Sequence, residues 1–355
     1  MDEIVATKRS TVEGREKCYA RYIRILTTHF CEKEVEKRVP EILAAFLKSL
    51  KNEPSEKETL FALRGIAITL ITCPSNTAAD TLKKAITNLY TTSESKDIKA
   101  AAIHSLGVIL YFGGAGDAEM EDMMDELLAV VETDGEAINA ADEGNVVAAA
   151  LDEWAFLAAQ LEDLEEKTEA AVEAFYDQLD STDARVQISA GRCIALLFER
   201  SYTDREDDDE PADAQEDDEG FLVDQSTVKR YDVWRNTHQL KTKLTDLAKI
   251  SSKQVATRDR KRLHETFRDV LNTVNYPSRG PQYSNAINQE TGQRYGSRLK
   301  IKIPDHGVMH INKWSDLIKL EELRRVLGGG FVVHYEKNEV VFNTLPSVYN
   351  SKSEE

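Results

Sequence analysis

Hydrophobic residues recur every three or four positions through the first 200 residues, and one short apolar helical segment with a small residue at its centre returns four times. The copies are Leu63–Leu70, Ile103–Leu110, Leu151–Leu157 and Gly191–Leu197. Their central residues are Ala67, Gly107, Ala155 and Ala195, so successive copies lie 40, 48 and 40 residues apart. A recurrence of about 40–47 residues is typical of HEAT and armadillo units, whose helix pairs bury their apolar sides only against neighbouring pairs. We therefore predict an armadillo-like array of antiparallel helices over residues 11–200; the alternative is an ordinary helical bundle with coincidental spacing.

Local signals place several helix ends within this array. Pro40 lies inside the apolar pattern of residues 34–50 and predicts that a helix starts or kinks there. Ser55 and Glu58 have the spacing of a capping box at the start of the next helix. The methionines between residues 120 and 124 follow a helical stripe and are expected in the core.

The composition changes abruptly after residue 200. Between residues 204 and 219 eleven residues are acidic and only Arg205 is basic. Like charges at this density repel one another and oppose folding. We predict an acidic disordered loop over residues 201–226.

Helical periodicity returns in residues 227–275, which we expect to continue the solenoid as basic helices. One helix is predicted from residue 231 to 250, and Ser251 with Gln254 forms a second candidate capping box before the next. That next helix carries an apolar stripe at Leu263, Phe267, Val270, Leu271 and Val274. Its apolar side can pack on the end of the solenoid while its basic side faces outward.

The remaining residues change character again. Residues 276–298 are predicted to form an irregular basic loop, residues 299–345 a small α+β domain, and residues 346–355 a disordered tail. Within the small domain, alternation predicts strands at 299–303 and 308–311, a helix at 315–327, and a hairpin made of 331–335 and 339–342. The predicted fold class is thus mostly α: a HEAT/armadillo-like α-solenoid with a small C-terminal α+β module.

Charge is distributed very unevenly along the chain. Residues 229–302 contain 17 basic and 6 acidic residues, a net charge of +11, whereas the whole chain carries −18, so the remaining residues sum to −29. Basic residues with interspersed tyrosines and histidines suit contact with a phosphate backbone. Charge alone equally allows a solvated helix face that balances the acidic half of the chain. The candidate RNA-binding residues are Lys253, Arg258, Arg260, Lys261, Arg262, Arg268, Arg279, Arg294, Arg298, Lys300 and Lys302.

No other chemistry is indicated: we identify no catalytic set, no cofactor site and no metal site. The glycine runs at 113–116 and 328–330 follow predicted helices, whereas phosphate-binding loops precede them, so we expect these runs to end helices. The four cysteines are widely spaced and are expected to be buried free thiols. No stretch of about 18 apolar residues and no signal peptide is evident, which predicts no membrane association and a location in the cytoplasm, the nucleus or both.

Three segments resemble a known family. Arg258–Leu271, with the sequence RDRKRLHETFRDVL, resembles the conserved segment of the interferon-related developmental regulator (IFRD) family. Ala190–Glu199 is similar to the end of that family's armadillo-like N-terminal domain. Trp314, Leu327–Tyr335 and Asn338–Glu339 are similar to its C-terminal domain, so the likeness runs in order along most of the chain.

The resemblance implies a regulator that is not an enzyme and has no small-molecule substrate. Through a close relative it implies binding to translationally inactive ribosomes at the tRNA sites, and through the family it implies transcriptional co-regulation with protein partners. That relative uses a basic C-terminal extension in the mRNA path; here residues 346–355 are acidic, and the loop at 276–296 could substitute for it. Our first hypothesis is a ribosome- or RNA-binding regulator of translation that uses a basic C-terminal surface. The alternative is a transcriptional scaffold whose solenoid groove binds protein partners.

Overall fold

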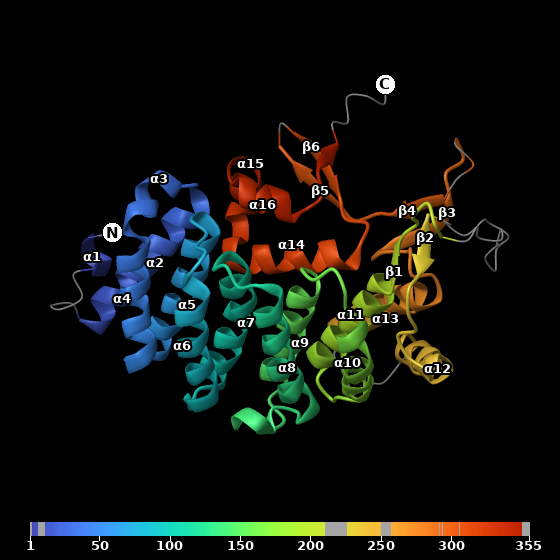
Figure 1. Cartoon of the computed structure of the whole chain (residues 1–355), viewed down its shortest axis with the longest axis horizontal. Helices are drawn as coiled ribbons and strands as arrows, with labels where there is room; N and C mark the ends of the chain where they lie inside the picture. The colour runs from blue at the N-terminus through green and yellow to red at the C-terminus, as the bar shows by residue number, and fades with distance from the viewer. Residues whose placement is uncertain are drawn as a thin grey trace. The chain divides into compact units, whose positions relative to one another are not determined.

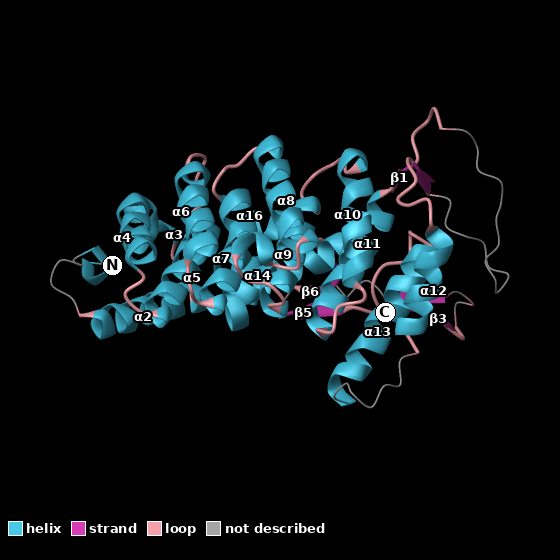
Figure 2. Cartoon of the chain, turned by 90° about the horizontal axis from the view of Figure 1, so that it is seen from below, coloured by secondary structure: helices cyan, strands magenta, loops and turns pink. Residues whose placement is uncertain are grey.

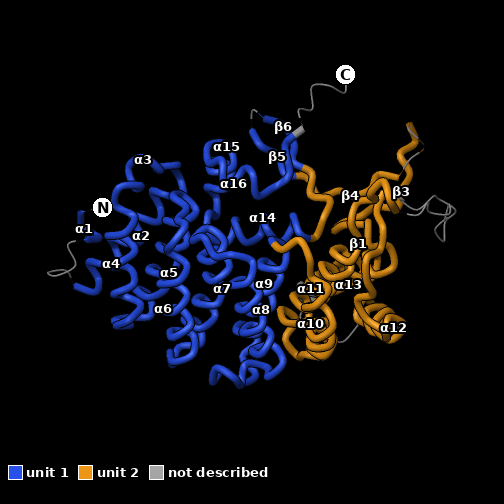
Figure 3. Tube along the Cα trace, in the orientation of Figure 1, with its two compact units in different colours: residues 1–160, 301–309, 315–355 blue, residues 161–300, 310–314 orange. Residues whose placement is uncertain are grey.

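The chain divides into two compact units (Figure 3). The computed structural model describes residues 2–5, 11–209, 226–249, 257–290, 292, 294–304 and 306–349, without the side chains of residues 257–259 and 349. Unit 1 comprises residues 1–160, 301–309 and 315–355, and unit 2 comprises residues 161–300 and 310–314. These bounds differ from the predicted segments, because the beginning and the end of the chain pack together in unit 1.

Unit 1 contains two rows of antiparallel helices, as the repeated segments predict (Figure 1). The inner row packs α2 on α5, α5 on α7 and α7 on α9, and the outer helices α4, α6 and α8 each pack on an inner helix. The structure is therefore mostly α, with solenoid-like stacking of helix pairs. The helices are α1 (Asp2–Val5), α2 (Val12–Thr28), α3 (Glu32–Val35), α4 (Val39–Asn52), α5 (Glu56–Thr72), α6 (Ala78–Thr92), α7 (Lys96–Phe112), α8 (Asp117–Glu132) and α9 (Gly144–Ala158), with 3₁₀ turns at Glu36–Arg38 and Glu136–Ile138.

The small residues of the repeated segments are buried in the inner helices, and at Gly107 two of these helices pack tightly against each other. Ala67 and Ala155 are buried in α5 and α9, and Gly107 is buried in α7. A Cβ atom on Gly107 would collide with the Glu153 carboxylate and lie 2.6 Å from Phe156 Cδ1. A larger residue at this point would require the side chains of Glu153 and Phe156 to shift, so the small residue in α7 is a packing requirement.

The local signals for helix ends are largely confirmed. Pro40 lies in the first turn of α4, where its missing N–H costs no hydrogen bond. The Ser55 hydroxyl accepts the Glu58 N–H at 3.0 Å and caps α5. The Glu58 carboxylate instead accepts hydrogen bonds from Arg15 and Ser49, so only half of the predicted capping box forms. The methionines of α8 are buried, as predicted.

The later residues of unit 1 form a small sheet and a group of helices. The sheet has the order β5 (Lys300–Ile303), β6 (Gly307–His310) and β7 (Val348–Tyr349), which confirms the two predicted strands. The helices are α14 (Trp314–Leu327), α15 (Phe331–Lys337) and α16 (Glu339–Thr344), with a 3₁₀ turn at Gly328–Gly330.

The predicted hairpin at 331–342 is wrong, because both of its segments are helical. The Asn338 side chain accepts the Val340 N–H at 3.1 Å and thereby caps α16. The same side chain donates to the Ile71 carbonyl at 2.7 Å, and the buried His334 Nε2 contacts the Leu26 carbonyl at 2.7 Å. These bonds to α2 and α5 stabilise helices where local propensity favours strands.

Helix α14 runs across the inner row of unit 1 (Figures 1 and 2). The Arg64 guanidinium on α5 donates to the Val326 carbonyl at 3.0 and 3.3 Å. Arg325 Nη1 on α14 donates to Glu153 Oε1 on α9 at 2.6 Å. The inner face of unit 1 is thus covered by helices from the end of the same chain.

Unit 2 is built around α11, which packs against α10 on one side and α13 on the other. Its elements are α10 (Glu165–Gln178), α11 (Ala184–Arg200), β1 (Tyr202–Asp204), β2 (Thr227–Lys229), α12 (Thr237–Leu247), α13 (Thr257–Asn275), β3 (Tyr283–Ile287) and β4 (Arg294–Ser297). Ala195, the fourth small residue, is buried in α11.

Several predictions for unit 2 need adjustment. The helix predicted at 231–250 is shorter and starts at Thr237. Strands β1 and β2 pair in antiparallel fashion on either side of the acidic segment, most of which lies outside the described residues, as do Ser251 and Gln254. The loop predicted at 276–298 is not irregular, since β3 and β4 form an antiparallel hairpin within it.

Candidate nucleic-acid interface

Helix α13 is amphipathic in the predicted sense. Leu263, Phe267, Val270 and Val274 are buried. Gly191 of α11 provides room for this face, because a Cβ atom there would lie 2.9 Å from a Phe267 ring carbon. The cations Lys261, Arg262 and Arg268 are exposed, so the apolar side packs on α11 and the basic side meets solvent.

The structure describes the remaining candidate residues on or before α13 only in part. Lys253 lies outside the described residues, and Arg258 lies in the first turn of α13 with its side chain undescribed. Arg260 is half-buried. Lys261 Nζ lies 3.8 Å from the Glu265 carboxylate, an exposed i,i+4 pair of the kind that contributes little to stability. Lys261 thus stays available to a stronger anion.

Arg279 is the exception among the candidates, because only 8% of it is exposed. Its guanidinium lies 3.7 Å from the centroid of the Tyr276 ring and 5.0 Å from that of Tyr283. Its Nη1 also donates to Asn272 Oδ1 at 3.1 Å. Arg279 therefore positions tyrosines rather than offering a surface charge, and the flanking tyrosines were the sequence signal for this role.

The other candidates line two strands. Arg294 is half-buried in β4, and Arg298 is exposed just beyond it. The Arg298 guanidinium lies 4.7 Å from the centroid of the Tyr295 ring, which is 50% exposed. Lys300 and Lys302 are exposed alternate residues of β5; Lys300 counts with unit 2 and Lys302 with unit 1.

Hydrogen bonds fix the hairpin to α13 within unit 2. The Gln282 N–H donates to Asp269 Oδ2 at 3.2 Å, and Thr273 Oγ1 donates to the Arg279 carbonyl at 2.7 Å. Trp314 Nε1 donates to the same Thr273 hydroxyl at 2.8 Å. Burial raises the pKa of Asp269, although the Gln282 N–H and the charge of Arg268 oppose the shift. The cations of α13 and of the hairpin are therefore held on one rigid support.

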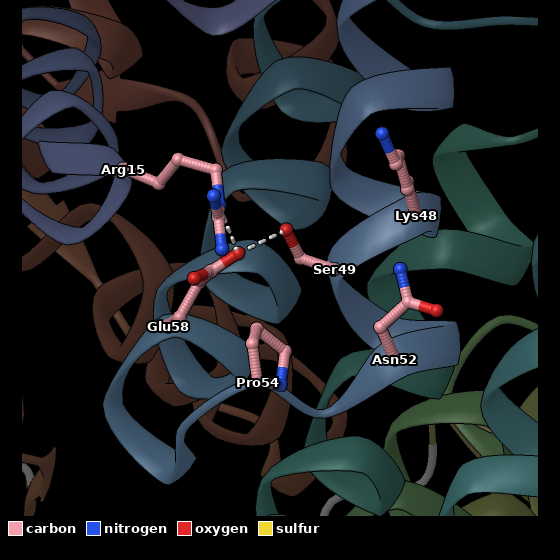
Figure 4. Close-up of a pocket in the computed structure, with 6 residues that line it drawn as sticks. All are labelled: Arg15, Lys48, Ser49, Asn52, Pro54 and Glu58. Atoms are coloured by element: carbon pink, nitrogen blue, oxygen red, sulfur yellow. Dashed lines mark hydrogen bonds and ion pairs between the residues drawn. The ribbon is translucent and has the colours of Figure 1, made fainter. Parts of the chain in front are cut away.

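A polar recess of about 100 Å³ lies in unit 1 (Figure 4). Arg15 of α2 and Ser49 of α4 point toward the buried carboxylate of Glu58 on α5, at 2.8 and 2.6 Å. The hydrogen bond with Glu58 raises the pKa of Arg15. Lys48 and Asn52 line the outer wall. This arrangement joins three helices through one carboxylate. The Ser49 hydroxyl and the Glu58 carboxylate are both buried, so their hydrogen bond supports packing between the helices rather than an exposed reactive group.

The rest of the described chain offers little reactive chemistry. No group of three or more His, Cys, Asp or Glu residues suited to a metal ion occurs among the described residues, nor is any described helix long and apolar enough to cross a membrane. Cys73 and Cys193 are buried, but Cys18 and Cys31 are partly exposed, which corrects the expectation that all four are buried. Burial raises the pKa of Cys73 to about 12, so its thiol stays protonated and unreactive at neutral pH.

Comparison with known proteins decides the family. Residues 1–275 match the sequence profile of the interferon-related developmental regulator (IFRD) family. This chain belongs to that family. The match ends at the last residue of α13, so the cationic helix lies within it and the β3–β4 hairpin lies beyond it.

A relative in fission yeast aligns with most of the chain. An uncharacterized protein of Schizosaccharomyces pombe is 27% identical over 344 residues, which are 96% of this chain and 72% of the yeast protein. The aligned length includes both units. The description of the family is that of a developmental regulator.

Proposed function

We propose that this chain is a non-enzymatic regulator that binds RNA, in the setting of the ribosome, and so modulates translation. The binding surface is the cationic platform of unit 2, which we define as Lys261, Arg262 and Arg268 of α13 with Arg298 and Lys300 after the hairpin. The observation that carries the proposal is the exposure of these cations on one hydrogen-bonded support within an otherwise acidic chain. This function would be exercised in the cytoplasm or the nucleus.

The spacing on α13 favours a polymeric anion. Lys261 and Arg268 are seven residues apart, two turns of helix, so they project from the same face about 10 Å apart. Cations repeated at such intervals neutralise successive phosphates and release their counterions. A single small anion would engage only one of them.

The alternative, a scaffold that binds peptides in the solenoid groove, is less well supported. The inner face of unit 1 carries α14 to α16, which form hydrogen bonds with Arg64, Glu153 and Ile71 of the inner helices. A partner peptide would have to displace these helices first. The cationic platform needs no such rearrangement.

The test is the salt dependence of RNA binding by a charge-reversed variant. Lys261→Glu/Arg262→Glu/Arg268→Glu removes three proposed phosphate contacts. The matched control is Lys33→Glu/Lys51→Glu/Lys84→Glu, which changes the net charge by the same amount at exposed residues of unit 1. Binding of a fluorescent single-stranded RNA is followed by anisotropy between 50 and 200 mM salt.

We expect the platform variant to bind more weakly and to reduce the slope of log affinity against log salt by about 2, since each single-strand phosphate contact contributes about 0.7. The control should keep the wild-type slope, with a small uniform loss from its net charge. Equal slopes for the platform variant and the control would refute the proposed surface.

A further inference from the structure

A cleft of about 330 Å³ opens in unit 2 between the β3–β4 hairpin and the residues at 310–312. Its walls include Tyr283, Tyr295, Ser297, His310 and Asn312. This volume lies at the small end of the range of ligand sites. The lining is aromatic and polar rather than purely apolar, so the ligand it suits has both a flat face and hydrogen-bonding edges.

The cleft is rigidly built. Tyr283 pairs with Ser297 across the hairpin. The single proton of the Ser297 hydroxyl faces the carbonyls of Ile311 at 2.8 Å and Pro281 at 3.1 Å, which share it. Gly280 approaches the Asn312 carbonyl so closely that any Cβ atom would collide with it. The two walls are therefore tied to each other before any ligand arrives.

A glycine with a left-handed backbone lies next to the aromatic wall of the cleft. Gly296 has φ of +66°, a conformation that L side chains rarely adopt, and a Cβ atom there would lie 3.8 Å from the Tyr283 ring. The neighbouring Tyr295 ring is half-exposed and has the Arg298 guanidinium 4.7 Å from its centroid. Arg279 supports the Tyr283 ring from its buried position. The result is an accessible aromatic surface beside a fixed positive charge.

We propose that this cleft binds one unstacked base of a single-stranded RNA. The base stacks on Tyr295, its edge meets the side chains of His310 and Asn312, and Arg298 contacts the adjoining phosphate. This inference rests on the proposed function. It adds contact with a base of the RNA to the phosphate contacts of the cationic platform. Recognition of this kind is common in single-stranded RNA binding, where aromatic side chains stack on splayed bases.

The positive charge around the cleft does not by itself distinguish RNA from an acidic peptide. The tyrosine rings do, because only RNA has bases that can stack on them. Residues 276–302 contain five basic residues and one acidic residue, which would attract either polyanion. A peptide of acidic side chains has no flat face to match Tyr295 and Tyr283. The test should therefore compare two oligonucleotides that have the same phosphate backbone and differ only in whether they carry bases.

The experiment compares an RNA 10-mer with a fully abasic 10-mer of the same charge, each titrated against the full chain by anisotropy. We expect wild type to bind the base-bearing oligonucleotide roughly tenfold more tightly, the effect of one base–aromatic stack. Tyr295→Ala should abolish this preference and leave affinity for the abasic strand unchanged, whereas Tyr295→Phe should retain it. Ile287→Ala, at a 46% exposed residue of the same hairpin outside the cleft, is the matched control and should behave as wild type.

The outcomes separate the two proposals. Equal binding of both strands, with the salt slope intact, overturns the base site but leaves the RNA-binding platform standing. Failure to bind either strand overturns both. A polyglutamate peptide that competes as well as the RNA would also overturn the base site.

Photocrosslinking of a 4-thiouridine RNA to the wild-type chain gives a second measurement that needs no variant. Crosslinks should map to residues 278–297 or 310–312, and crosslinks confined to α13 would contradict the proposal.

Discussion

Glu153 offers the sharpest test of how α14 is held in unit 1. Its side chain is fully buried, with Oε1 accepting from Arg325 Nη1 at 2.6 Å and Oε2 accepting from the Gly107 N–H at 3.0 Å. The buried carboxylate of Glu322 also contacts Arg325, which is one-third exposed. Two buried carboxyl groups thus share one guanidinium, and the other ionisable groups facing them are His104 and Asp152.

The pKa of Glu153 determines how strongly the free energy of unfolding depends on pH. Burial raises this pKa from 4.5 to about 7, although Arg325 opposes the shift, and burial raises the pKa of Glu322 as well. Because the folded state binds the proton more tightly than the unfolded state, the Glu153 contribution to the free energy of unfolding falls as pH rises from 4.5 to 7. At about 1.4 kcal/mol per pH unit, the loss is on the order of 3 kcal/mol.

Glu153→Gln removes this titration and keeps an acceptor for the Gly107 N–H. Urea unfolding at pH 5 and pH 7.5, followed by amide exchange in α9 so that it reports on unit 1, should show the variant gaining about 2–3 kcal/mol on wild type over that interval. Burial lowers the pKa of His104 to about 4, but this group is present in both proteins and largely cancels. Glu132→Gln, at the exposed end of α8, is the control. A difference between variant and wild type that is the same at both pH values would refute the reasoning.

Two further predictions concern packing in unit 1. Gly107→Ala should lower the free energy of unfolding by about 1–3 kcal/mol, because the added Cβ meets Glu153 and Phe156; an unchanged urea midpoint would contradict this close approach. Asn338→Ala should cost about 1–2 kcal/mol, because it removes both the cap of α16 and the bond to the Ile71 carbonyl. Hydrogen exchange should then accelerate in α15 and α16, and unchanged protection there would show that the cap is not what orders them.

The helical array could be predicted because its signals are local and repeated. The small residues Ala67, Gly107, Ala155 and Ala195 mark helices α5, α7, α9 and α11 in the sequence before any contact is known. The amphipathic pattern of α13 likewise fixes which side is buried. By contrast, Arg325 and Glu153 lie 172 residues apart, and nothing local to either predicts their pairing.

The errors arose where tertiary contacts outweigh propensity. Phe331 to Val333 and Val340 to Phe342 are β-branched and aromatic, yet bonds from Asn338 and His334 to neighbouring helices make both segments helical. The β3–β4 hairpin has no clear polar–apolar alternation between Tyr283 and Ile287, so periodicity did not reveal it. The basic residues and the tyrosines among them identified the region of the candidate site, but neither predicted that Arg279 is buried against the rings of Tyr276 and Tyr283.

The central claim is that the exposed cations of unit 2 bind RNA of the ribosome. The direct measurement is sedimentation of the purified chain with ribosomes through a sucrose cushion at physiological salt. Wild type and the Lys33→Glu/Lys51→Glu/Lys84→Glu control should pellet with ribosomes, and the Lys261→Glu/Arg262→Glu/Arg268→Glu variant should stay in the supernatant. Pelleting of that variant to the wild-type extent, or failure of wild type to pellet at all, would contradict the claim.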